Sequence, residues 1–67
     1  MTVKRLHTIR FDGHTVTLVE TRSHRLFCQH AYAGYCVGDA IQVNPHASSF
    51  VRRAVEAYAG EHGLAVR

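Results

Sequence analysis

Cysteine and proline are scarce in this chain, and no stretch of it is apolar enough to cross a membrane. It holds two cysteines, one proline and five glycines among 67 residues. Two cysteines are too few for a secreted disulfide scaffold, and so little proline and glycine is untypical of a disordered linker. No run of about 18 apolar residues occurs, and the first residues show no apolar signal segment. We therefore expect a folded, cytoplasmic protein with reduced thiols and no membrane partner.

The chain is also short, which limits what it can enclose. With 67 residues, of which 46% are hydrophobic, it is expected to form a single small domain over residues 1–67. A domain of this size buries a smaller share of its surface than a larger one, so a metal, a disulfide or a second subunit commonly adds stability. We therefore expect little room for a substrate pocket, and homodimerisation is a subordinate prediction.

Acidic residues are fewer than basic ones, and the imbalance lies near the N-terminus. Eight Lys and Arg against five Asp and Glu give a net charge of +3. Residues 1–25 hold five of the basic and two of the acidic residues, whereas the rest of the chain is balanced. This excess favours an acidic partner but is far below the basic stripe of a dedicated nucleic-acid-binding protein. Nucleic-acid binding is therefore an alternative function, through Lys4, Arg5, Arg10, Arg22 and Arg25.

The dipeptide Asp12-Gly13 is the clearest local signal. It lies between two alternating runs, residues 3–11 and 14–21, and is typical of a two-residue type I′ hairpin turn. In that register Arg5 lies opposite Glu20, and the same side supplies the core with Ile9, Phe11, Val16 and Leu18. The other side is polar and β-branched, and it carries Lys4, Leu6, Thr8, Arg10, Thr15, Thr17, Val19 and Thr21.

Two shorter apolar runs predict further strands. Residues 25–30 follow a turn and are expected to form a third strand, and residues 39–43 alternate as a fourth. Residues 31–38 lie between them, contain two glycines and are open to two interpretations, a loop or a distorted hairpin. Tyr32 and Tyr35 lie in this segment and are expected either to close the end of the core or to contact a partner.

A single amphipathic helix is predicted over residues 45–62. Asn44 is a favourable N-cap, and Pro45 suits the first helical position. Apolar residues recur at steps of three and four, and Gly63 suits the left-handed position that ends a helix. Gly60 is unfavourable inside a helix, so an end at Gly60 is the alternative. Together these elements predict an α+β fold, with the helix packed on one face of an antiparallel sheet of three to four strands. The opposite sheet face and one sheet edge are left uncovered.

Cysteine and histidine suggest a metal site as a further alternative. Cys28, His30 and Cys36 are potential ligands, and His24 or His46 could supply a fourth for zinc. Their spacing lacks the close Cys-x2-Cys pairs of common structural zinc sites, and buried cysteines more often behave as small apolar residues. The same residues do not form a recognisable nucleophile, base and oxyanion arrangement. We therefore predict no enzyme activity and no cofactor, with zinc kept as the alternative.

These observations favour a small interaction module that acts through surface contact as a regulator, inhibitor or adaptor. A protein is the favoured partner, bound through the free sheet face or edge, because β-strand edges and Tyr or Arg side chains serve well at protein interfaces. The expected contact residues are exposed polar, basic and aromatic side chains: Lys4, Thr8, Arg10, Thr15, Thr17, Arg22, Arg25, Tyr32, Tyr35, Arg52 and Arg53.

Overall fold

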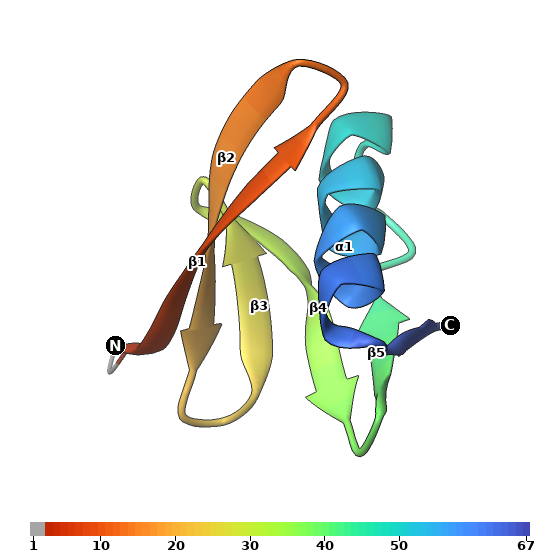
Figure 1. The fold of residues 1–67 in the computed structure, drawn as a ribbon. Helices are drawn as coiled ribbons and strands as arrows, with labels where there is room; N and C mark the ends of the chain where they lie inside the picture. Colours follow the sequence, from red (N-terminus) through yellow and green to blue (C-terminus); the bar gives the residue numbers. More distant parts are fainter. Residues whose placement is uncertain (1–2) are drawn as a thin grey trace.

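The chain runs as five successive antiparallel strands, then a helix, then a short sixth strand that returns to the sheet (Figure 1). The structure is a computed structural model that describes the backbone of residues 3–67 and the side chains of residues 5–67. The elements are β1 Val3–Phe11, β2 His14–Thr21, β3 Arg25–Cys28, β4 Ala31–Val37, β5 Ala40–Val43, α1 Ser49–His62 and β6 Ala65–Val66. The strands lie in the order in which they follow one another in the chain.

The first hairpin confirms the predicted turn and register. Asp12 and Gly13 both have positive φ angles, 48° and 78°, as a type I′ turn requires. Ile9 pairs with Val16, and Arg5 pairs with Glu20. Alternation along the two strands then sends one set of side chains towards α1 and the other set away from it.

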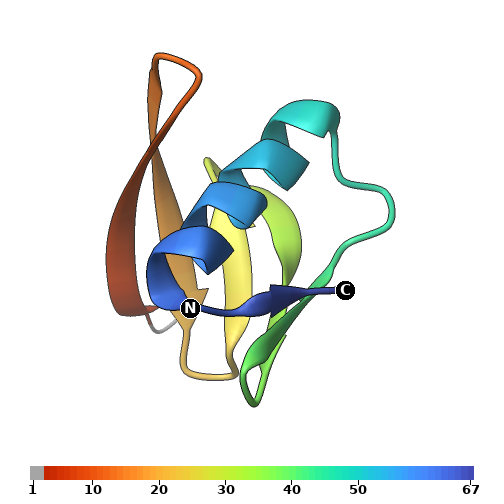
Figure 2. The ribbon, with the colours of Figure 1, turned by 45° about the vertical axis from the view of Figure 1, so that its right-hand side comes forward.

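The predicted α+β class is confirmed, but the sheet is larger than the three to four antiparallel strands expected. Residues 31–37 form a full strand, β4, and their alternation is hidden in the sequence because a bulge interrupts it. β6 pairs parallel to β5, with Ala40 opposite Ala65 (Figure 2). Gly63, at φ 66°, reverses the chain after α1 and brings these last residues beside the sheet.

The third strand is shorter than the predicted 25–30. β3 ends at Cys28, which pairs with Ala31, and the two residues between them form the turn. Gln29 and His30 have φ angles of 49° and 75°. Neither is a residue that commonly signals such a turn, so the sequence pattern extended the strand through both. β5 in turn begins at Ala40, one residue later than predicted.

The helix begins at Ser49, four residues later than predicted. Ser48 is the N-cap, and its side chain accepts a hydrogen bond from the Val51 amide at 3.2 Å. Asn44 instead closes a preceding turn, where its Oδ1 accepts from the His46 amide at 3.1 Å. The Asn44 Nδ2 donates to the Tyr32 carbonyl at 3.0 Å, which ties this turn to β4. Of the two predicted ends, the one at Gly63 is confirmed, because the Leu64 amide donates to the Ala59 carbonyl beyond the Gly63 cap.

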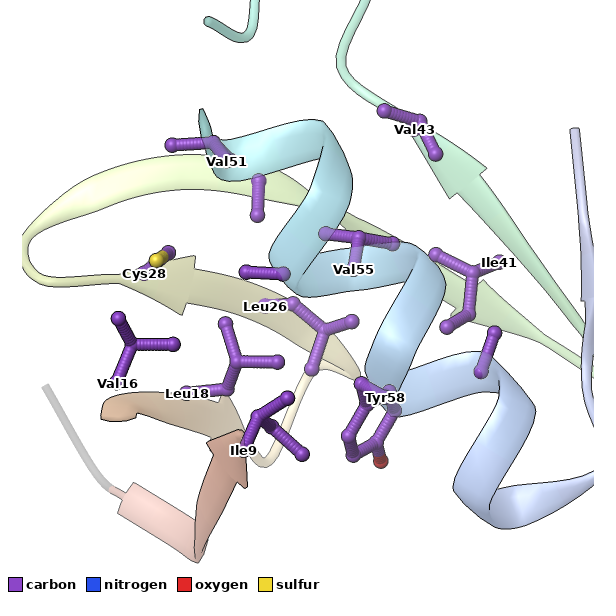
Figure 3. Packing of buried hydrophobic residues seen from close by; sticks show 13 residues of the cluster. Ile9, Val16, Leu18, Leu26, Cys28, Ile41, Val43, Val51, Val55 and Tyr58 are labelled. Carbon is purple, nitrogen blue, oxygen red and sulfur yellow. The ribbon is translucent and has the colours of Figure 1, made fainter. Parts of the chain in front are cut away.

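The core lies between α1 and the face of the sheet that the helix covers (Figures 1 and 2). Leu18, Leu26, Ile41 and Val55 are fully buried, and Phe11 packs at the margin. Figure 3 shows side chains of the sheet and of α1 pointing towards one another across this layer. No helix of the described residues is long and apolar enough to span a membrane.

Candidate functional site

No described element covers the face of the sheet that points away from α1, and we call it the outer face. Its side chains alternate with those of the core along each strand. Most of them are exposed, whereas Val19 and Phe27 are half-buried by their neighbours. In the described residues the outer face comprises Leu6, Thr8, Arg10, Thr15, Thr17, Val19, Arg25, Phe27, Tyr32, Tyr35, Val37 and Gln42.

An apolar row crosses four strands of the outer face. Leu6 pairs with Val19, Val19 with Phe27, and Phe27 with Tyr32. The rings of Phe27 and Tyr32 meet edge to face, with centroids 5.6 Å apart. Leu6 is 69% exposed and Tyr32 is 37% exposed, so the row ends in accessible side chains on both sides.

A bulge in β4 places the second tyrosine on the same face as the first. Tyr32 and Tyr35 are three residues apart, so a regular strand would send them to opposite faces. Tyr32 pairs with Phe27, Gly34 with Leu26 and Tyr35 with Arg25, which leaves Ala33 as the extra residue. Ala33 is buried in the core, and Tyr35 is 41% exposed on the outer face.

The outer face is positively charged and bears no acidic side chain in its described positions. Arg10 and Arg25 are both exposed there, and neither forms an ion pair with another described residue. The acidic residues lie in turns, in α1 or on the helix-covered side of the sheet, and they are Asp12, Glu20, Asp39, Glu56 and Glu61. No acidic side chain of the described outer face therefore neutralises the charge of Arg10 or Arg25.

The structure divides the predicted contact residues between two surfaces. Thr8, Arg10, Thr15, Thr17, Arg25, Tyr32 and Tyr35 lie together on the outer face. Arg22 is exposed in the turn after β2, and the side chain of Lys4 lies outside the described residues. Arg52 and Arg53 are on α1, in the other layer, where Arg53 donates to the Asp12 carboxylate at 2.8 Å. This pair links the helix to the tip of the first hairpin.

A polar cluster at the edge of the core was not anticipated from the sequence. Glu20 is 7% exposed and faces the helix layer. Its carboxylate lies 3.5 Å from His7 Nε2 and 3.7 Å from His24 Nδ1, although Arg5 is its register partner. The Tyr58 hydroxyl lies 3.4 Å from the same His7 nitrogen. His7 pairs with Leu18, which precedes Glu20 by two residues and therefore lies on the same face of β2. This register places His7 near Glu20, and it was the signal that could have indicated the cluster.

Two buried groups between α1 and the sheet, the Tyr58 phenol and the Cys28 thiol, hold their protons more strongly than usual. Burial raises the pKa of the Tyr58 phenol, and the charges of Glu20 and Cys36 raise it further, against a lowering by Arg5. Burial also raises the pKa of the Cys28 thiol. A thiol held in its neutral form is a poor nucleophile and a poor metal ligand. Cys28 accordingly behaves as an apolar core residue.

The residues suggested as zinc ligands are not brought together. Cys28 lies at the turn end of the β3–β4 hairpin, whereas Cys36 lies beyond Tyr35 at the opposite end. His30 is exposed in the turn, and His24 is directed towards Glu20. In the described part of the chain no three His, Cys, Asp or Glu side chains are grouped so that they could hold a metal ion.

No family model, curated protein or solved structure matches this chain. Its function is therefore inferred from the geometry of the outer face.

Proposed function

We propose that this protein is a small, non-enzymatic binding module whose outer face holds an anionic macromolecule. The observation that carries the proposal is the chemistry of that face, which presents exposed Tyr32 and Tyr35 together with Arg25, the register partner of Tyr35, and bears no acidic side chain in its described positions. Arg10 adds a second positive charge near the hairpin end of the same face. Aromatic and arginine side chains supply most of the energy at macromolecular interfaces. Arginines that have no acidic neighbour also attract a negatively charged partner towards the surface.

A heparin column tests this proposal with matched variants. Replacing Arg10 and Arg25 together with Gln removes two charges from the outer face, while replacing Arg52 and Arg67 removes two exposed charges elsewhere. We expect the Arg10→Gln/Arg25→Gln protein to elute at clearly lower salt than the Arg52→Gln/Arg67→Gln protein, because the outer face makes the contacts. Equal shifts in the two variants, or no retention of the wild-type protein, would contradict the proposal.

A strand of a partner protein, bound at the edge of β1, is the second candidate. β1 is the first strand in the sheet order and pairs with β2 on one side only, so its other edge is unpaired within the described sheet. Such an edge can add a strand from another chain, including a second copy of this one. Light scattering at tens of micromolar protein is expected to report a dimer if a second copy binds there, whereas a species of 7.5 kDa would exclude that copy.

A further inference from the structure

Resting on the proposed function, we infer that the anionic partner is a single-stranded nucleic acid whose bases stack on Phe27, Tyr32 and Tyr35. Aromatic rings on an open surface serve as stacking platforms for unpaired bases, and nearby cations neutralise the phosphates. The outer face carries Phe27 and Arg25 on β3 and the two tyrosines on the adjacent β4, with Arg10 further away on β1. Tyr35 pairs in register with Arg25, and Tyr32 pairs with Phe27 two residues further along β3.

The aromatic side chains are available for such contacts. Tyr32 is 37% exposed and Tyr35 is 41% exposed, and the hydroxyl of neither makes a hydrogen bond to another described residue. Their shared direction depends on the β4 bulge, which is secured by the glycine at position 34. A Cβ added to Gly34 would collide with the backbone oxygen of Gln42 in β5. The protein thus maintains, at the cost of an irregular strand, an arrangement that presents two tyrosines on one face.

The polar part of the outer face suits a phosphate backbone. The guanidinium groups of Arg10 and Arg25 are exposed and unpaired among the described residues, and guanidinium binds phosphate with two hydrogen bonds. Exposed hydroxyls of Thr8, Thr15 and Thr17 lie on the neighbouring strands β1 and β2, and hydroxyls are common phosphate donors. Arg25 therefore lies among the aromatic residues, opposite Tyr35 and two residues from Phe27, whereas Arg10 and the hydroxyls lie on β1 and β2.

Other occupants match this surface less well. A second copy packed face to face would bring the unpaired arginines of both chains into one interface, where like charges repel. A duplex presents few ring faces for Tyr32 and Tyr35, because its bases are stacked on one another. An acidic peptide would satisfy Arg10 and Arg25, but its carboxylates alone would not pack on the exposed rings. A single strand uses both the charges and the rings.

Fluorescence anisotropy with labelled oligonucleotides of about 15 nucleotides tests the inference directly. The probes are oligothymidylate, oligouridylate, a DNA duplex of the same length and a labelled polyglutamate. We expect both single strands to bind more tightly than the duplex and the polyglutamate, with an affinity that falls as salt rises. The DNA and RNA probes distinguish the two sources of a single strand, because only RNA offers a 2′-hydroxyl to the surface.

The variants separate stacking from charge. Tyr32→Leu and Tyr35→Leu are each expected to weaken binding of the single strands by at least about fivefold, the loss of one stacked base. Tyr35→Phe, which keeps the ring, should bind as the wild type does. Arg10→Gln/Arg25→Gln tests the contribution of charge, and Arg52→Gln/Arg67→Gln is its matched control. Thermal unfolding of each variant shows that the fold is retained, since both tyrosines are exposed.

Four outcomes decide between the two proposals. Preference for single strands, with loss in the Leu variants and retention in Tyr35→Phe, supports the inference. Equal binding of the duplex, or no loss in the Leu variants, overturns the inference, while weakening by Arg10→Gln/Arg25→Gln would still support the proposed function. Binding of polyglutamate alone also overturns it and identifies an acidic protein as the partner. Binding of no probe overturns both.

Discussion

Gly34 in β4 lies so close to Gln42 in β5 that a side chain at position 34 would collide with the Gln42 backbone oxygen. The φ of Gly34 is 154°, a backbone conformation that residues with a Cβ rarely adopt. This close approach accompanies the bulge that turns Tyr32 and Tyr35 to one face. The glycine therefore connects a local backbone requirement to the chemistry of the proposed binding surface.

Replacing Gly34 with Ala is expected to lower the free energy of unfolding by roughly 3 kcal/mol, through backbone strain and the collision with β5. Gly13→Ala is the matched control. Gly13 also has a positive φ, 78°, but nothing lies within 4 Å of the added Cβ. It should lose only about 1 kcal/mol, the usual cost of a left-handed residue. Urea unfolding measures both variants, and equal losses would contradict the proposed role of the Gln42 contact.

Ser48→Ala is expected to destabilise the protein by about 1 kcal/mol, because Ser48 accepts the hydrogen bond of the Val51 amide at the start of α1. The neighbouring Ser49 is the first helical residue and is exposed, so Ser49→Ala should change the free energy of unfolding by less than about 0.5 kcal/mol. Both values come from thermal or urea unfolding. A larger loss at Ser49 than at Ser48 would show that the cap is placed wrongly.

The two histidines beside Glu20 should contribute unequally to stability. The His7 side chain is 12% exposed and its ring packs against Tyr58, with centroids 4.7 Å apart, whereas the His24 side chain is 56% exposed. His7→Ala is therefore expected to cost about 1 to 2 kcal/mol through lost packing. His24→Ala should cost less than about 0.5 kcal/mol, since the His24 ring is mostly exposed and its removal loses little packing. Urea unfolding near neutral pH measures both losses. Equal losses for His7→Ala and His24→Ala would contradict the larger packing contribution of His7.

Stability should fall in alkaline solution because Cys28 and Tyr58 bind their protons more strongly when folded. Their pKa values are raised above 9.0 and 10.0, so the unfolded chain releases these protons first as the pH rises. The free energy of unfolding is thus expected to decrease above about pH 9, first through Cys28 and then through Tyr58, until the folded groups also ionise. Urea unfolding at a series of pH values measures this loss.

Tyr58→Phe should remove the part of the alkaline loss that begins above pH 10, because its ring cannot ionise. Tyr32→Phe provides the control, since this tyrosine is exposed on the outer face. If Tyr32→Phe flattened the alkaline profile as much as Tyr58→Phe did, burial of Tyr58 would not be the cause.

Local signals predicted some elements well. Asp12-Gly13 has the backbone preferences of a type I′ turn, so it specified both the hairpin and its register. Gly63 likewise ended α1 where a left-handed residue is needed. The start of the helix was predicted wrongly, because Asn44 and Ser48 are both good caps and Asn44 is instead held in the preceding turn by contacts with β4, among them the one with the Tyr32 carbonyl. That contact joins residues twelve apart in the chain.

The sequence by itself determined the α+β class, the first hairpin and the presence of a free sheet face, because turn residues and the period of apolar side chains act locally. Only the tertiary structure decided that residues 31–37 are a strand and that 65–66 join the sheet. It also decided that Tyr32 and Tyr35 share one face, and that Glu20 lies between His7 and His24. Bulges, parallel pairing and buried polar contacts depend on neighbours distant in sequence, and periodicity along one segment cannot reveal them.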